Sequence, residues 1–357
     1  SDRKIDLKNG TLTANTLNLK AGGSVKQTAA HAITAKTVSV DSASGISLDS
    51  GAGLADNPKF NDFQTVTVKN GSDATDVIIG SGGSKDLTVF FDTDSKAKNV
   101  TVRNYKNGTV NNLTVNGPVT AAGGISLVND EADLKTTGTL TVGSGRLHEQ
   151  AAGALENEDS LTGDDIILNS TKGMINKSLI ATHKVELTAA NDILNQGIVQ
   201  AGTSVSMKSD TGSITNKGDV EAKGGDVTMD AKTDLHNQGV VKASQDVGLT
   251  SGQSMANEQA VTAGRNLKMK AGMMLTNGGD LTATNGSIEL TAQKGLRQNG
   301  NATAGSSITL DNQQDGNLVV TGDVESGTAA TIKNQNGDVT IDGQVEAKTG
   351  DATVKTG

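Results

Sequence analysis

A three-part unit of short alternating segments recurs through most of this 357-residue chain. In its clearest copy, Val205–Met207, Ile214–Asn216 and Val220–Ala222 each place inward-type residues at i and i+2. That spacing belongs to one face of a β-strand, and the intervening Gly, Asp, Ser, Lys and Thr favour turns. The first segment returns in steps of 19 to 22 residues, starting at Ile166, Val185, Val227, Val247, Leu267, Ile288 and Ile308.

A period near 20 residues with three strands per unit is typical of a parallel β-helix. One coil cannot bury its own inward residues, but stacked coils can, because each strand pairs with its equivalents in the neighbouring coils. Parallel crossovers are nearly always right-handed. We therefore predict an all-β, right-handed parallel β-helix, a solenoid with about three short strands per coil, forming a monomeric rod.

The composition agrees with a repeat fold and argues against several classes of function. Aromatic residues make up 1% of the chain, two residues are Pro and none is Cys, which is unlike an enzyme with a large core. The net charge of −9 and the lack of a basic patch argue against a nucleic-acid partner. No apolar run is long enough for a transmembrane helix, so we expect no membrane insertion. No secretory signal begins at Ser1, so we expect a mature or excised segment of a longer protein.

The repeat divides the chain into three regions. Residues 1–51 and 116–357 follow the pattern, and both regions are expected to form regular coils. Residues 52–115 break it, keep strand-like pieces at irregular spacing, and hold every aromatic residue of the chain. Departures from a repeat usually map to loops on one face, so we expect irregular coils or a protrusion there.

The regular regions resemble a known family. The stretches LNQGIVQAGTSVSMKSDTGSITNKGDVEA and LHNQGVVKASQDVGLTSG are similar to repeats of the filamentous haemagglutinin family, over roughly residues 1–50 and 117–357. The resemblance implies a secreted or cell-surface adhesin of a Gram-negative bacterium, exported by a two-partner system with an outer-membrane transporter as its partner. The family's amino-terminal secretion domain is not recognisable, and neither is a carboxy-terminal toxin.

An asparagine repeats on the inward face of the second segment of each unit. A buried amide costs a few kcal/mol unless it is hydrogen-bonded, but amides stacked one per coil can bond to each other and to the following turn. We interpret this set as a structural Asn ladder, rather than a polar ligand groove, comprising Asn157, Asn176, Asn195, Asn216, Asn237, Asn257 and Asn277.

The chain shows no convincing metal or cofactor site. The acidic run from Glu156 to Asp165 alternates with inward-type residues, which favours a solvated face over a calcium site. A single loose glycine-rich stretch at residues 71–83 is too little for a calcium-binding nonapeptide repeat. The four histidines, His31, His148, His183 and His236, have no metal-ligand spacing. We expect neither metal nor cofactor.

The best candidates for a binding site are the aromatic residues Phe60, Phe63 and Tyr105. Aromatic rings supply large rigid contact areas, including stacking surfaces for sugars. The alternative is structural: one ring of the Phe90–Phe91 pair must point inward, and Phe60 and Phe63 could fasten a loop onto the helix.

Three functions fit these features. The first is a structural and adhesive rod of a large surface adhesin, which attaches to a receptor or glycan on host or bacterial cells. The second is the stalk of a contact-dependent toxin-delivery protein, whose toxin lies elsewhere. The third is a β-helix enzyme acting on polysaccharide, which the aromatic-free faces of the regular region disfavour, so we expect no enzymatic activity.

Overall fold

A computed structural model describes residues 3–8, 11–28, 32–50 and 60–357. Every regular element among these residues is a β-strand, and every strand pairing with a stated register is parallel. No helix long and apolar enough to cross a membrane occurs in the described part. The chain divides into two units, Ser1–Ala181 and Thr182–Gly357.

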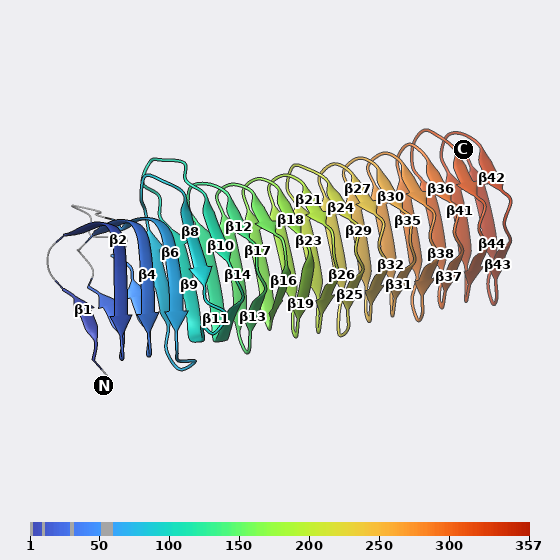
Figure 1. Cartoon of the computed structure of the whole chain (residues 1–357). Coiled ribbons are helices and arrows are strands. Elements are labelled where there is room, and N and C mark those ends of the chain that lie inside the picture. The colour runs from blue at the N-terminus through green and yellow to red at the C-terminus, as the bar shows by residue number, and fades with distance from the viewer. Residues whose placement is uncertain (1–2, 9–10, 29–31, 51–59) are drawn as a thin grey trace. The chain divides into compact units, whose positions relative to one another are not determined.

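Unit 2, residues 182–357, is built from one three-strand turn repeated in register (Figure 1). One strand of each turn contributes to one face: β21 (Ile193–Asn195), β24 (Ile214–Asn216), β27 (Leu235–Asn237), β30 (Met255–Asn257), β33 (Leu275–Asn277), β36 (Leu296–Gln298), β39 (Leu318–Val320) and β42 (Val339–Ile341). A second short strand is β22 (Val199–Ala201), β25 (Val220–Ala222), β28 (Val241–Ala243), β31 (Val261–Ala263), β34 (Leu281–Ala283), β37 (Ala302–Ala304), β40 (Val324–Ser326) or β43 (Val345–Ala347). The third strand is β20 (Val185–Ala189), β23 (Val205–Ser209), β26 (Val227–Ala231), β29 (Val247–Ser251), β32 (Leu267–Ala271), β35 (Ile288–Ala292), β38 (Ile308–Asn312), β41 (Ala330–Asn334) or β44 (Ala352–Thr356).

The register of unit 2 stacks like on like. Val205 pairs with Val227, and Val227 with Val247, so inward side chains lie above one another in the interior. Alternate residues of the strands from β20 to β41 are buried, as in the BiB pattern of β25, whereas β42, β43 and β44 have no buried residue. Stacking of this kind lets a chain with few large side chains bury most of its Val, Leu and Met residues, although Val240, Met273 and Met274 remain exposed.

Unit 1, residues 3–181 as described, follows the same plan with longer strands. One face is formed by β2 (Leu12–Ala21), β4 (Ile33–Ser42), β6 (Asp62–Asn70), β8 (Leu87–Phe91), β10 (Leu113–Asn116), β12 (Leu134–Thr136), β15 (Leu155–Asn157) and β18 (Met174–Asn176). The remaining faces are formed by β1 (Ile5–Leu7), β3 (Val25–Gln27), β5 (Ile46–Leu48), β7 (Val77–Ser81), β9 (Ala97–Asn104), β11 (Val119–Asn129), β13 (Leu140–Val142), β14 (Arg146–Ala151), β16 (Ser160–Gly163), β17 (Asp165–Ser170) and β19 (Ser178–Ala181).

The irregular region of the sequence keeps the parallel pairing wherever it is described. Val66 of β6 pairs with Val89 of β8, and Leu87 pairs with Leu113 of β10. The connections absorb the uneven spacing, while the strands continue the stack. Residues 51–59, which include Pro58, lie outside the described part.

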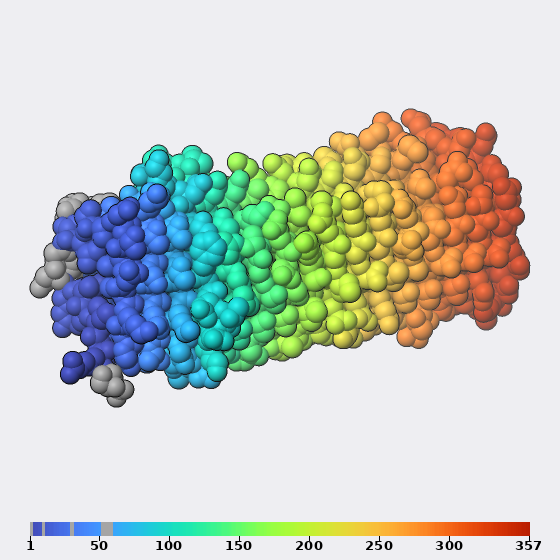
Figure 2. Space-filling model, in the orientation of Figure 1, coloured from blue at the N-terminus to red at the C-terminus, as the bar shows by residue number. Residues whose placement is uncertain are grey.

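The architecture confirms the predicted fold: all-β, parallel, with three strands per turn and eight turns on the first-named face of each unit among the described residues. Within each unit, Figure 2 shows the chain as consecutive colour bands. That order is expected when each turn contacts only its neighbours.

Candidate functional site

The outer corner of each turn carries a row of side chains that hold successive turns together. We call it the corner row: the residue immediately before the inward Val, Leu or Ile of the third strand. In unit 2, Asp226 Oδ1 accepts the backbone N–H of Asp246 at 2.9 Å, and Asp246 Oδ1 accepts that of Asn266 at 2.9 Å. Asn266 Oδ1 does the same for Ser287 at 3.1 Å. Each acceptor satisfies a backbone donor of the next turn.

The same row exists in unit 1, but it is interrupted. Asn99 donates to Asp76 Oδ1 at 2.9 Å, and its own Oδ1 accepts the N–H of Gly124 at 2.9 Å. Gly124 precedes Ile125, whose register partner in the next turn is Leu147, and it has no side chain with which to accept the N–H of Arg146, the residue before Leu147. Arg146 itself places a cation where most other turns have Asp, Asn or Ser.

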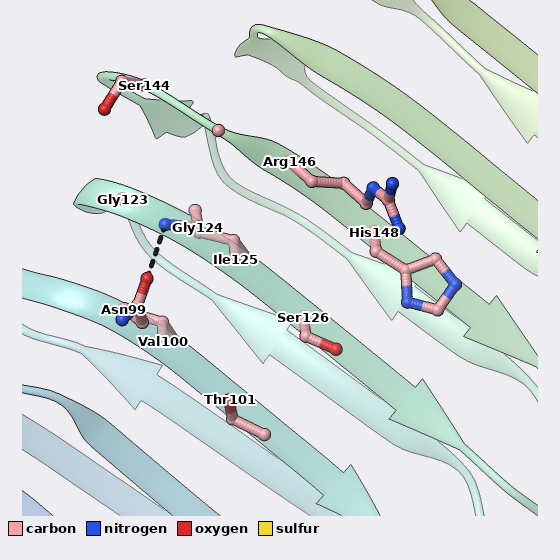
Figure 3. A pocket seen from close by; sticks show the side chains of 11 residues that line it. Asn99, Val100, Thr101, Gly123, Gly124, Ile125, Ser126, Ser144, Arg146 and His148 are labelled. Carbon is pink, nitrogen blue, oxygen red and sulfur yellow. Dashed lines mark hydrogen bonds between the residues drawn. The ribbon is translucent and has the colours of Figure 1, made fainter.

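A surface groove of about 570 Å³ lies over this interruption. Figure 3 shows Asn99 reaching Gly124, and Arg146 and His148 extending together from β14. Three successive turns form its walls and floor, chiefly through Asn99, Thr101, Gly124, Ser126, Arg146 and His148. The groove is lined by polar side chains and by the backbone of Gly123, Gly124 and Gly145, and a recess with a few polar groups is typical of a small-ligand site.

Glycine makes the groove possible. A Cβ on Gly123 would lie 2.5 Å from Asn99 Oδ1, and one on Gly124 would lie 3.2 Å from the Arg146 carbonyl oxygen. Gly145, one turn further, has a φ of +116°, which other residues rarely adopt. A side chain at Gly123 or Gly145 would clash with an atom of the preceding turn, so glycine lets the turns that form the groove approach closely.

Two basic side chains stand at one wall. Arg146 makes no salt bridge within the described part of the chain, although Asp165 is its register neighbour in β17. Burial lowers the pKa of His148, and the positive charge of Arg146 lowers it further. Both effects favour the neutral imidazole, in which one ring nitrogen donates a hydrogen bond and the other accepts one.

Directly inside the same strand lies a buried acid. Glu149 is 0% exposed and takes the inward position that Leu127 and Leu168 fill in the adjacent turns. Its Oε1 accepts a hydrogen bond from the Thr136 hydroxyl at 2.9 Å, whereas Oε2 makes none among the described residues. A carboxyl group replaces a leucine in an apolar stack.

The surroundings of Glu149 change its acidity. Burial raises the pKa of the Glu149 carboxyl to about 7, which the nearby Thr136 hydroxyl and Asn157 amide only partly oppose. Both side-chain polar atoms of Asn157 are buried and make no well-formed hydrogen bond with a described residue. The interior of unit 1 thus holds a carboxyl group and an amide that lie near each other without a well-formed hydrogen bond.

Sequence reasoning missed Glu149 and the groove. The inward pair Ile125 and Leu127 continues one turn later as Leu147 and Glu149, so the period itself could have placed the acid inside. The groove had a weaker signal, the Gly123–Gly124 pair followed one turn later by an arginine, because corner lengths vary between turns.

The predicted Asn ladder is hydrogen-bonded through unit 2. Asn195 Nδ2 donates to Asn216 Oδ1 at 2.6 Å, and the same bond links each later pair through Asn257 to Asn277 at 2.6 or 2.7 Å. Asn277 continues to Gln298 Oε1 at 3.1 Å. Each amide also donates to a carbonyl two residues on, such as Gly239 for Asn237. In unit 1, Asn157 and Asn176 hold the equivalent inward positions and are buried.

The aromatic candidates do not form one surface. Phe63 is 0% exposed in the core, so its ring cannot reach a partner in the folded chain, and the expectation that it binds is corrected here. Phe60 and Tyr105 do meet: their rings stack with centroids 5.3 Å apart, and Arg103 lies 4.8 Å from the Tyr105 centroid. Phe60 is half-buried, whereas Tyr105 is buried, with 8% of its surface exposed.

Packing explains these rings. The Tyr105 hydroxyl donates to Asp49 Oδ2 at 2.8 Å, and burial, followed by that bond, raises the pKa of Tyr105. A Cβ on Gly82 would lie 2.5 Å from the Phe60 ring, and one on Gly80 would lie 2.9 Å from the Tyr105 ring. The glycines of the 71–83 stretch thus make room for aromatic side chains. Of the Phe90–Phe91 pair, Phe91 is buried and Phe90 is 41% exposed.

The acidic run is used in ion pairs and backbone contacts. Lys135 binds Glu158 at 2.7 Å and Glu156 at 3.4 Å, and Asp164 accepts the N–H of Gly145 at 2.9 Å. Within the described ranges, no three His, Asp or Glu side chains are grouped to hold a metal ion. His236 contacts Glu258 at 2.5 Å, and His31 lies outside the described residues.

Comparison with known proteins gives one partial relationship. The chain is 26% identical over 213 residues to Deoxyribonuclease CdiA of Dickeya dadantii (strain 3937). The match covers 59% of this chain but 6% of that relative, so the chain spans a small fraction of the relative's length. No family model matches the chain. No solved structure matches it either.

Proposed function

We propose that this chain is a run of coils from a much larger secreted bacterial protein, in which it serves as an adhesive rod. The observation that carries the proposal is the unbroken register of unit 2, where the same residue types occupy the same positions turn after turn. In such a repeat, further turns add length at constant cross-section. The architecture and the partial match fit either an adhesin-like rod or a toxin-delivery stalk.

The toxin-delivery stalk is the second candidate. It is favoured by the name of the matched relative, a deoxyribonuclease of which the match covers 6%. In this alternative, the chain positions a toxin domain that lies elsewhere in the protein. The remainder of the reading frame separates the two, because a carboxy-terminal nuclease or other toxin domain favours the stalk.

We infer that the chain itself is not an enzyme. In the regular turns, polar side chains pair with polar side chains of the adjacent turn. Lys268 pairs with Glu289 at 2.9 Å, and the inward amides form hydrogen bonds along the Asn ladder. Incubation of the purified chain with double-stranded DNA and with polysaccharides tests this inference. Release of nucleotides or new reducing ends, absent from a heat-denatured sample, would contradict it.

The proposed setting is the bacterial surface or the medium, reached through an outer-membrane transporter. The proposed partner of the exposed rod is a receptor or glycan on a host or bacterial cell. An attachment assay tests the adhesive role. The purified 357-residue chain should bind target cells saturably and compete with bacteria that display the full-length protein.

The control is an equal concentration of the same chain after heat denaturation. If the folded chain neither binds nor competes, while deletion of these coils from the full-length protein abolishes attachment, the coils are a spacer and the adhesive role is wrong. If deletion also has no effect on attachment, the toxin-delivery stalk is favoured instead.

A further inference from the structure

The groove in unit 1 marks the place where the corner row changes its chemical character. In turns such as those of Asp226 and Asp246 the row presents an oxygen atom, and that oxygen accepts the N–H of the next turn. At Gly124 the acceptor is missing, and at the next position a guanidinium stands instead. The row therefore has a deficit of negative charge and an excess of hydrogen-bond donors at this point.

We propose that the groove over Gly124 binds an oxyanion, a carboxylate or phosphate group of a ligand, in the place of the missing corner side chain. Arg146 can direct two N–H donors at such a group, which is the strongest pairing available to a carboxylate or phosphate. The side chain is exposed and has no ion-pair partner among the described residues, so it is available.

The rest of the groove suits the atoms around an oxyanion. Thr101, Ser126 and His148 lie in one row, because Ser126 is paired in register with both of the others. Their hydroxyl and imidazole groups can bond to neighbouring polar atoms of the ligand. A volume of about 570 Å³ accommodates a small polar ligand.

Two aspartates of the next turn oppose the anion. Asp164 uses its carboxylate to accept the N–H of Gly145 at 2.9 Å. Asp165 is paired in register with Arg146 but forms no salt bridge with it. Asp165 repels an incoming anion and can compete for Arg146, so its removal should strengthen binding. This opposite effect distinguishes a built site from general loss of charge.

Nuclear magnetic resonance of the imidazole groups provides the test. The chain has four histidines, and His148→Gln identifies the His148 signal by its loss. The full chain is titrated with inorganic phosphate and, separately, with acetate, and chloride keeps the ionic strength constant. We expect a saturable shift of the His148 signal alone. Saturation by phosphate only, by acetate only or by both assigns the ligand group as phosphate, carboxylate or either.

Three variants sharpen the result. Arg146→Gln should weaken binding at least about tenfold, and Asp165→Asn should strengthen it about threefold. Arg265→Gln is the control, because Arg265 already pairs with Asp246 at 2.8 Å in unit 2. Each variant must melt like the parent. An equal response to chloride, no saturation, or an unchanged affinity in Arg146→Gln together with no gain in Asp165→Asn would overturn the proposal.

Discussion

Units 1 and 2 bury polar side chains in the same architecture with opposite outcomes. In unit 2, Asn237 accepts one bond from Asn216 and donates to both Asn257 and Gly239, so its amide is paired on every side. In unit 1, Glu149 keeps one carboxyl oxygen unpaired, next to the unpaired amide of Asn157. The contrast teaches that burial alone does not decide the cost of a polar group in a solenoid; the supply of partners from adjacent turns does.

The outer surfaces differ in a related way. The corner row of unit 2 repeats its side-chain acceptors from Asp226 through Asn266 to Ser287. In unit 1 the row is broken at Gly124, and the groove opens over the break. The recess over the intact row of unit 2, lined by Asp226, Asp246 and Asn266, has about 270 Å³, whereas the recess over the break in unit 1 has about 570 Å³.

The largest effect is expected from the aromatic residues of unit 1. Phe63→Ala should lower the free energy of unfolding by about 4 kcal/mol, because it leaves a cavity in a fully buried site. Phe60→Ala should lower it by about 1 kcal/mol, since that ring is half-buried and loses mainly its stack on Tyr105. The fluorescence of Tyr105, the single tyrosine in a chain without tryptophan, reports unfolding of this unit in urea. Equal losses for both variants would mean that Phe63 is not a core residue.

A slightly smaller effect is expected from the ladder of unit 2. Asn237→Asp removes the donor to Gly239 and Asn257, and it points a carboxylate at two acceptors, so we expect a loss of about 3 kcal/mol. Asn299→Asp is the matched control, because Asn299 is exposed and acts only as an acceptor for the Thr321 hydroxyl. Far-ultraviolet circular dichroism during urea unfolding measures both. The ladder interpretation fails if the two variants unfold at the same urea concentration.

The pH dependence of unit 1 is expected to originate at Glu149. The folded chain retains the Glu149 proton to about pH 7, whereas an ordinary glutamate loses it near 4.5. The unfolded state therefore binds fewer protons between these values, and stability falls as the pH rises through that window and levels off above it. Glu149→Gln should remove this slope and raise the free energy of unfolding at pH 8 by about 2 kcal/mol.

The control for this experiment is Glu156→Gln, which alters a partly exposed glutamate paired with Lys135. It should leave the slope in place. If the parent shows no fall in stability between pH 4.5 and 7, or if Glu149→Gln keeps the fall, the carboxyl is not buried in the way described.

The sequence predicted the features that repeat and missed those that depend on a single exception. The inward positions of Val205, Ile214 and Asn216 can be predicted, because equivalent residues recur every 19 to 22 residues. Glu149 occupies the inward position that Leu127 occupies one turn earlier. Because a charged residue is ordinarily assigned to the surface, its burial is recognised only when the turns on either side of it are considered.

The aromatic residues show a second limit. Burial of Tyr105 depends on the space left by Gly80, a residue of the preceding turn. It also depends on the Asp49 carboxylate, which accepts a hydrogen bond from the Tyr105 hydroxyl. Neither of these two contacts recurs from turn to turn, so the sequence repeat does not predict them. The groove likewise depends on the length and composition of the corner at Gly123–Gly124, and strand periodicity carries no information about corners.

The central claim is that successive turns stack in register, so that the number of turns between two residues sets the distance between them. Spin-label spectroscopy within unit 2 tests this claim directly. The chain has no cysteine, so labels can be placed at Thr215→Cys and Thr340→Cys, which lie six register steps apart on one face. At about 4.8 Å per step, the backbone separation is about 29 Å. Deletion of residues 241–260, one turn because Val241 pairs with Val261, should shorten the distance by about 5 Å and preserve a narrow distribution. An unchanged distance, or a broad distribution in the parent, would contradict the stacked-turn account.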